Sequence, residues 1–434
     1  MAPQKTLQAF LATARAALTA PPSKRSTPLH FVVGNESADL DSLCSALFLA
    51  YFRSHEPPHT LHIPLCHLPR EDLALRPELA AVLRRAAVAP DDVLTLSELP
   101  PPGPDGLLRP EDTRWLLVDH NVMTGALGRT YGGRVVGCID HHEDEGKVPR
   151  DAAPRVIEKA GSCMSLVVEQ CAEAWDALAK TDDGGGSEDR RVINEQLAYL
   201  ALGPILIDTN ALGSKDKTTA HDERAAAVAE AKIRSVSSVS VSGSGTGTDN
   251  ETKEIIGPDL KRFFDEVSAL KEDISGMSLR DILRKDYKEW TTAEDNDDNE
   301  GTGLRLGMSS VPQPFAFLVD KAGGEEAFVR ELERWSASKG LDVTAVLTTC
   351  KAAANGGKFS RELLVWARTG PEVAAAVKRF AERNGKEKLG LGMWGDGRLD
   401  AEGGGSWRRC WTQAEVRNSR KQIAPMLRDA LKGV

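Results

Sequence analysis

The chain has 434 residues, of which 41% are hydrophobic and 27% charged, and its formal net charge at pH 7 is −9. This length predicts two domains with sizeable cores, and the acidic balance argues against a nucleic-acid-binding protein. No apolar run approaches the length of a membrane span, so no membrane partner is expected. The seven cysteines are scattered and form no CxxC pair, which predicts reduced thiols in a cytoplasmic protein.

Strand-like and helix-like segments alternate over residues 29–208, which predicts an α/β domain with a parallel sheet and helices on both faces. Strands are expected at residues 29–33, 115–118, 134–139 and 202–207. Helices are expected at residues 42–53, 77–87, 162–179, 189–201 and 221–233.

Each of these four apolar runs leads into aspartate. The aspartates are, in chain order, Asp39 and Asp41, then Asp119, then Asp140, and finally Asp208. Carboxyl ends of parallel strands meet at one sheet edge, where open α/β folds bind ligands. A single such aspartate could simply cap the next helix. Four of them with the pair His141 and His142 favour a divalent-metal site, and all nine histidines lie at or before His221.

The second half of the chain differs in composition. A Ser/Gly-rich run from Ser235 to Asp249 predicts a flexible linker, placed at residues 235–254. It divides an N-terminal domain, residues 1–234, from a C-terminal domain, residues 255–434. The latter is expected to be α+β, with helices at 259–270 and 278–286 and strands at 304–308, 343–347 and 362–366.

Two segments suggest anion binding without establishing it. Arginine suits phosphate oxygens through paired N–H donors, but a short basic run such as Arg417–Gln422 is usually solvated surface. The segment Gly161–Ser165 opens a helix and could direct backbone N–H groups at an anion, or Ser162 could simply cap that helix.

Five motifs, in this order, resemble the DHH phosphoesterase superfamily in the branch with a DHHA2-type second domain. They are Asn35–Ser42, Val118–Asn121, Asp140–His142, Gly161–Ser165 and Ile207–Thr209. The branch contains family II inorganic pyrophosphatases, cytosolic exopolyphosphatases and prune-like proteins. The resemblance covers nearly the whole chain outside the Ser/Gly-rich run. It implies a parallel-sheet DHH domain, a smaller DHHA2 domain and an active site in the cleft between them.

The resemblance also implies residue roles at a site for two or more divalent ions, Mg²⁺, Mn²⁺ or Co²⁺. Asp119 would bridge two ions; Asp39 would hold one, and Asp41, His141 and Asp208 the other. His142 would contact the phosphate or assist the leaving group, and Asp140 would orient a histidine.

In the second domain, Lys288, Arg420 and Lys421 match the positions that bind the electrophilic phosphate. Lys215 and Lys217, which follow Asp208, are further candidates for phosphate binding.

Asn35 distinguishes among the members of this branch. Family II pyrophosphatases begin the first motif with a metal-binding histidine, whereas Asn35 follows the pattern of cytosolic exopolyphosphatases. The residues expected to serve catalysis are therefore Asp119, His142, Asp140 and Asn35. We predict a monomeric exopolyphosphatase that releases terminal orthophosphate from linear polyphosphate. The alternatives are a pyrophosphatase, a prune-like short-chain polyphosphatase or regulatory scaffold, and a single-strand nuclease of the wider superfamily.

Overall fold

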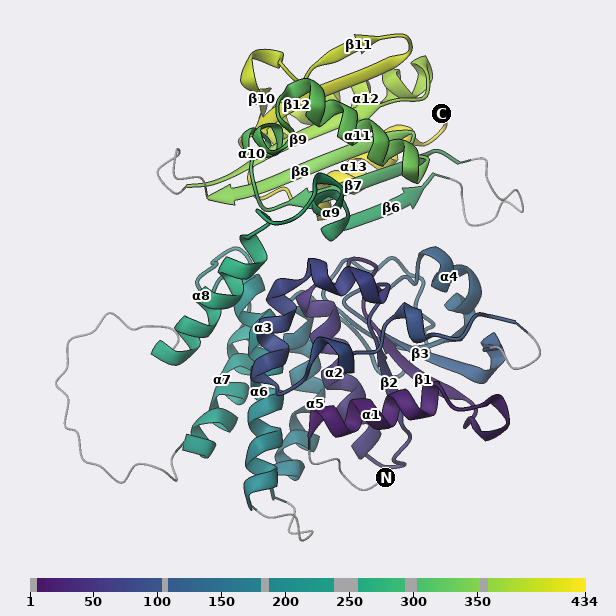
Figure 1. Cartoon of the computed structure of the whole chain (residues 1–434), viewed down its shortest axis with the longest axis vertical. Coiled ribbons are helices and arrows are strands. Elements are labelled where there is room, and N and C mark those ends of the chain that lie inside the picture. The colour runs from purple at the N-terminus through teal and green to yellow at the C-terminus, as the bar shows by residue number, and fades with distance from the viewer. Residues whose placement is uncertain (1–5, 104–107, 181–186, 238–256, 293–302, 352–357) are drawn as a thin grey trace, which may run out of the picture. The chain divides into compact units, whose positions relative to one another are not determined.

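The computed structural model describes residues 6–103, 108–180, 187–237, 257–292, 303–351 and 358–434. The chain folds into two compact units, Met1–Lys271 and Glu272–Val434 (Figure 1).

The first unit contains a five-stranded parallel sheet in the order β2-β1-β3-β4-β5. Its strands are β1 (Leu29–Val33), β2 (His62–Leu65), β3 (Thr113–Val118), β4 (Val135–Asp140) and β5 (Arg155–Ile157). The strands expected at residues 29–33, 115–118 and 134–139 are thus confirmed. In register, Val33 lies opposite Leu117 and Val118 opposite Ile139. The residues that follow β1 and β3 are therefore brought to the same sheet edge as the end of β4.

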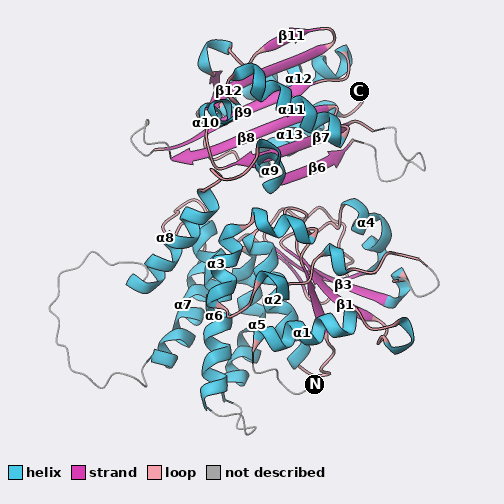
Figure 2. Cartoon of the chain, viewed as in Figure 1, coloured by secondary structure: helices cyan, strands magenta, loops and turns pink. Residues whose placement is uncertain are grey.

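Eight α-helices are described in this unit. They are α1 (Leu7–Leu18), α2 (Leu40–His55), α3 (Pro77–Arg85), α4 (Gly125–Tyr131), α5 (Cys163–Lys180), α6 (Ser187–Thr209), α7 (Ala220–Ser237) and α8 (Pro258–Glu272). Helix α2 packs against β1, β2 and β3 and also against α5 and α6, which in turn contact α7 (Figure 2). Its residues from Leu40 to Phe52 are all buried, so α2 is a central core helix.

The expectation of a fourth strand at residues 202–207 is wrong, because this run lies inside α6. The residues from Leu200 to Leu206 are buried, and Pro204 lies within the helix. A helix surrounded by core has apolar residues on every side, so a short stretch of it reads like a buried strand. Asp208 consequently lies in the last turn of a helix rather than at a strand end.

Helix α8 packs with the first unit. Its Leu260, Phe263 and Val267 belong to the same buried cluster as the sheet, and the Phe263 ring lies 5.3 Å from that of Tyr199. The boundary between the compact units therefore follows α8, whereas the sequence placed this helix in the second domain. Of the expected linker, residues 235–237 end α7 and residues 238–254 lie outside the described residues.

The second unit is built on a seven-stranded mixed sheet in which β7 and β8 are parallel and the other neighbours antiparallel. Its strands are β6 (Tyr287–Thr291), β7 (Arg305–Val311), β8 (Val343–Lys351), β9 (Phe359–Ala367), β10 (Leu391–Met393), β11 (Ala401–Gly403) and β12 (Ser406–Gln413). The three strands expected from the sequence correspond to β7, β8 and β9.

Two separate cores cover the two faces of this sheet. One core joins α12 (Pro371–Asn384) and α13 (Arg420–Leu431), and the other joins α9 (Leu279–Lys285), α10 (Phe315–Ala322) and α11 (Glu325–Lys339). Among the described residues, no helix is long and apolar enough to cross a membrane.

Candidate metal centre

Asp119 lies at the centre of the candidate site, one residue past β3. Its backbone is left-handed, with φ of 61°, a conformation that aspartate tolerates better than most residues. Carboxylate Oδ2 accepts hydrogen bonds from Asn35 Nδ2 and Ser42 Oγ, each at 2.7 Å. Oδ1 lies 3.2 Å from His141 Nε2 and 3.8 Å from His142 Nδ1. The two oxygens therefore have different environments, one facing amide and hydroxyl donors and the other facing imidazoles.

Asn35 is oriented by Ser37. Its Oδ1 accepts the Ser37 backbone N–H at 2.9 Å and the Ser37 hydroxyl at 2.7 Å. Because a backbone N–H can only donate, this contact fixes the amide oxygen toward Ser37 and the amide nitrogen toward Asp119. In this arrangement Asn35 positions Asp119 and does not present its oxygen to a metal ion.

Asp140 is fully buried at the end of β4 and holds both histidines of the motif. Its Oδ1 accepts from His142 Nδ1 at 2.7 Å and from the His141 backbone N–H at 2.8 Å, while Oδ2 accepts from Asn121 Nδ2 at 2.6 Å. Burial opposes ionisation, but the His142 and Asn121 hydrogen bonds outweigh it and hold the Asp140 pKa well below its usual range. Asp140 thus remains ionised and orients His142.

The imidazole of His141 is oriented differently from that of His142. Its Nδ1 lies 3.0 Å from the Ala160 carbonyl oxygen, which can only accept, so Nδ1 carries a proton and Nε2 is the ring atom that faces Asp119. A backbone acceptor on the far nitrogen is the usual arrangement for a metal-binding histidine. The Asp119 oxygen and one nitrogen from each of His141 and His142 lie within 4.8 Å of one another.

Asp39 and Asp41 begin α2. Asp39 caps the helix by accepting the Ser42 N–H at 3.0 Å. Asp41 accepts the backbone N–H groups of Cys163 and Met164, at 2.7 and 2.9 Å, and so contacts the first turn of α5. Burial, followed by the charge of Asp119, raises the pKa of Asp41 to about 7.

Asp208, in the last turn of α6, interacts electrostatically with Asp41 and Asp39. Burial and then the charge of Asp41 raise its pKa to about 7, and burial and then the charge of Asp39 raise that of Asp119. Carboxylates that repel one another in a buried site are stabilised in their ionised form by a cation. Carboxylate oxygen and imidazole nitrogen together suit Mn²⁺ or Co²⁺, and the carboxylates suit Mg²⁺. The donor set therefore fits divalent metal ions.

Asp222, in the first turn of α7, is a site residue that the sequence analysis missed. Its fully buried carboxylate accepts the N–H groups of Gly161 and Ser162, at 2.9 and 3.1 Å, and the Ser165 hydroxyl at 2.6 Å. It also accepts the Thr219 N–H and hydroxyl, at 2.7 and 2.8 Å. The sequence does contain a signal for Asp222. It follows Thr219 by three residues, which is the spacing of a helix-capping pair.

These contacts change the interpretation of Gly161–Ser165. The N–H groups of Gly161 to Met164 are taken by the carboxylates of Asp222 and Asp41, so the segment is not a free anion site. Nor does Ser162 cap α5, because its buried hydroxyl has no hydrogen-bond partner within the described part of the chain. Through these hydrogen bonds, the motif connects the start of α5 to Asp41 in α2 and to Asp222 in α7.

Two of the predicted lysines lie in the turn between α6 and α7. The backbone N–H of Lys217 donates to the Ser214 carbonyl oxygen at 3.1 Å, which closes this turn, and Lys215 is exposed within it. The turn directly follows Asp208 and Thr209.

In the second unit, the predicted cations gather where β6 and α13 begin. Arg420 forms an ion pair with Asp286 at 2.8 Å and also donates to the Asp286 carbonyl oxygen at 3.0 Å. Lys288 follows two residues later in β6, and Lys421 lies in the first turn of α13. This turn is capped by Ser419.

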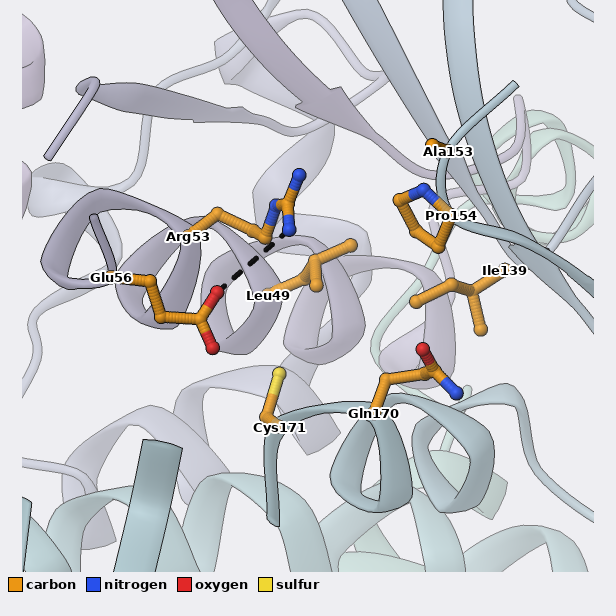
Figure 3. Close-up of a pocket in the computed structure, with 8 residues that line it drawn as sticks. All are labelled: Leu49, Arg53, Glu56, Ile139, Ala153, Pro154, Gln170 and Cys171. Atoms are coloured by element: carbon orange, nitrogen blue, oxygen red, sulfur yellow. Dashed lines mark ion pairs between the residues drawn. The ribbon is translucent and has the colours of Figure 1, made fainter. Parts of the chain in front are cut away.

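A cavity of about 270 Å³ lies elsewhere in the first unit and contains no predicted site residue. It is lined by α2, by α5 and by residues of the β4–β5 region, and Arg53 pairs with Glu56 in it at 3.8 Å (Figure 3).

A parallel sheet ending in buried carboxylates and a histidine pair, followed by a unit with a mixed sheet, defines a class of α/β hydrolases, the DHH phosphoesterases. Family models agree: one described as "DHH family, N-terminal domain" matches residues 30–203, and one described as "DHHA2 domain" matches residues 265–430. The chain belongs to the DHH family, in the branch with a DHHA2 second domain.

Several relatives resemble this chain over most of its length. A Schizosaccharomyces pombe protein named "Putative exopolyphosphatase" is 30% identical over 407 residues, 93% of this chain and 91% of its own. Human "Exopolyphosphatase PRUNE1" is 26% identical over 434 residues, 98% of this chain and 79% of its own. A Methanocaldococcus jannaschii "Manganese-dependent inorganic pyrophosphatase" is 24% identical over 284 residues, 64% of this chain and 81% of its own.

The fold also matches a solved structure. The crystal structure of a Methanococcus jannaschii "putative family II inorganic pyrophosphatase" aligns with a TM-score of 0.52 at 20% identity, covering 93% of this chain and 99% of the other. At this identity the match supports the fold alone.

Proposed function

We propose that the protein is an exopolyphosphatase that hydrolyses terminal orthophosphate from linear inorganic polyphosphate. The observation that carries the proposal is Asn35, which stands where family II pyrophosphatases have a metal-binding histidine and which here donates to Asp119. The similarity to the fission-yeast protein over almost the whole chain supports the same assignment.

The proposal assigns divalent ions, Mg²⁺, Mn²⁺ or Co²⁺, to the carboxylate cluster. Their ligands would be Asp39, Asp41, Asp119, His141 and Asp208. When bound, two such ions would lower the pKa of a water molecule and neutralise phosphoryl oxygens.

His142 has the geometry of a substrate-contacting residue. Its Nδ1 is held by Asp140, and its side chain is 24% exposed, so a phosphate oxygen can approach the imidazole. The adjacent ionised Asp140 stabilises the protonated imidazole, which can donate to the phosphate or to the departing oxygen. Asp140 and Asn35 act as positioning residues, on His142 and Asp119 respectively.

The second unit would supply the cations that bind polyphosphate. Arg420 is oriented by Asp286, and Lys421 lies at a helix N-terminus, where the peptide dipoles also favour an anion. Lys288 adds a third charge, and Lys215 and Lys217 from the first unit are secondary candidates. The proposal includes a monomer in the cytoplasm, whose reducing conditions fit the seven free thiols.

The test measures phosphate release from long-chain polyphosphate, tripolyphosphate and pyrophosphate with Mg²⁺, Mn²⁺ or Co²⁺. The proposal predicts that long chains are the preferred substrate. The relative named a pyrophosphatase makes pyrophosphate hydrolysis the second candidate function, and preference for that substrate would establish it instead. Absence of turnover with every metal would indicate a regulatory scaffold.

A further inference from the structure

The second unit contains a buried arginine that the proposed site does not use. Arg361 lies in β9 and is 8% exposed. In register it lies opposite Thr349 of β8 and Gln413 of β12. Since directly opposed residues of antiparallel strands share a face, all three lie on the face covered by α12 and α13. Arg361 thus places a charged guanidinium next to this hydrophobic core.

Within the described residues, Arg361 has little compensation for its charge. Its guanidinium makes one hydrogen bond, from Nε to the Val416 carbonyl oxygen at 2.7 Å, and stacks 5.0 Å from the Phe359 ring. Arginine carries five N–H donors, and those of both terminal nitrogens lack an acceptor here. Burial lowers the Arg361 pKa to about 10, with no carboxylate acting against it. A buried charge without a partner is costly, and an anion removes that cost.

Arg408 shows that burial alone does not leave an arginine of this unit without a compensating carboxylate. It lies in β12 on the opposite face of the sheet, is 9% exposed, and likewise donates one hydrogen bond from Nε, to the Leu399 carbonyl oxygen at 2.7 Å. Burial also lowers the Arg408 pKa, but the carboxylate of Asp400 opposes that shift. Two arginines of equal burial therefore differ in whether a carboxylate offsets their charge.

Arg361 and its neighbour Gln413 contact the turn that precedes α13. Gln413, its neighbour in register, donates from Nε2 to the Glu415 and Asn418 carbonyl oxygens, at 2.8 and 2.6 Å. Together with the Arg361 bond to Val416, these contacts hold the turn that ends at the cap residue Ser419. Arg420, the first residue of the helix, contacts Asp286 just before β6. Contacts from β9 and β12 thus hold the turn before α13, and a contact from the residue before β6 holds its first residue.

The two sides are well separated across the sheet. Strands β6 and β9 are three strand spacings apart, or about 14 Å between backbones. Arg361 is also displaced from Lys288 along the strands, because in register Lys288 is level with Val365, four residues further along β9.

We infer that Arg361, beside the turn that precedes α13, forms a second phosphate subsite, which binds an inner phosphate of a polyphosphate chain whose end is held by Lys288 and Arg420. This inference rests on the proposed function for its substrate. It makes Arg361 a residue that selects long chains over pyrophosphate.

The test compares Arg361→Met, Arg361→Lys and the matched control Arg408→Met in the full chain. Binding of long-chain polyphosphate and of pyrophosphate is titrated in EDTA, where no turnover occurs, and melting temperatures are recorded. Arg361→Met should weaken polyphosphate binding about ten-fold or more, as for a lost charge-assisted hydrogen bond. Pyrophosphate binding should change little, and Arg408→Met should retain wild-type affinity for both ligands.

Arg361→Lys keeps the positive charge and serves if the methionine variant does not fold. It should bind polyphosphate with intermediate affinity, because a lysine cannot replace a bidentate guanidinium. If the folded Arg361 variants bind polyphosphate like wild type, or weaken both ligands equally, the subsite is excluded. Hydrolysis by the wild-type protein is measured separately. Arg361-dependent binding without turnover would contradict the proposed function while supporting the subsite.

Discussion

Asn35 donates a hydrogen bond to the same Asp119 oxygen that accepts one from Ser42, while the other Asp119 oxygen faces His141. Under the proposed function, the asparagine would therefore act on the metal ions through Asp119 and not as a ligand. A histidine at this position would present a ring nitrogen in place of an amide donor. Under the proposed function, asparagine in place of histidine at this position would alter both the number of metal ligands and the orientation of Asp119.

Asn35→His should shift selectivity toward pyrophosphate. An added imidazole would give the proposed metal site a further protein ligand. The ratio of kcat/KM for pyrophosphate to that for polyphosphate should rise about ten-fold, or ~1.4 kcal/mol of differential transition-state stabilisation. Asn35→Ala is the control: it removes the bond to Asp119 without adding a ligand, and should lower both activities together. An unchanged ratio in Asn35→His would place specificity elsewhere, for instance in the second domain.

Asp119→Asn should abolish most activity while leaving the fold intact. The amide keeps the shape of the side chain but removes the charge that the proposal assigns to both ions, so kcat should fall by several orders of magnitude. Circular dichroism and the melting temperature check the fold. Asp216→Asn, an exposed change in the turn between α6 and α7, should behave like wild type. Substantial activity in Asp119→Asn would mean that the two-metal assignment is wrong.

Asp208→Asn should stabilise the metal-free protein at alkaline pH. The Asp208 pKa is about 7 in the folded protein against an ordinary value of 3.8, so the folded state binds more protons between these values. Its contribution to stability is fully present below pH 4 and is lost as pH rises through 7. In EDTA, the melting temperature of the variant relative to wild type should therefore rise from pH 5 to pH 8. A difference independent of pH would contradict the raised pKa.

Asp222→Asn should disturb the site without removing a proposed ligand. The carboxylate accepts from five donors, and an amide nitrogen facing backbone N–H groups cannot replace it. We expect a lower melting temperature and metal affinity reduced about 10- to 100-fold, as for other residues that position ligands. Isothermal titration with Mn²⁺ measures the affinity. If a folded Asp222→Asn protein binds Mn²⁺ with wild-type affinity, then Asp222 only caps α7 and does not position the metal site.

The sequence allowed the sheet edge to be predicted because β1, β3 and β4 are short apolar runs that end in polar residues. The strand expected at residues 202–207 was wrong, since a core helix and a buried strand look alike over six residues. The sequence also left Gly161–Ser165 undecided, because the carboxylates that occupy its N–H groups come from Asp41 and Asp222, far away in the chain. The orientation of Asn35 depended on a contact with Ser37 that residue types alone do not reveal.

The proposed function requires that the site hydrolyse polyphosphate chains in preference to pyrophosphate. Its most direct test is phosphate release by the purified full chain, with long-chain polyphosphate and pyrophosphate supplied at equal phosphoanhydride concentration and with Mg²⁺, Mn²⁺ or Co²⁺. We predict that release from polyphosphate far exceeds that from pyrophosphate and ceases in EDTA. Equal or faster release from pyrophosphate, or turnover that persists without divalent metal, would contradict the claim.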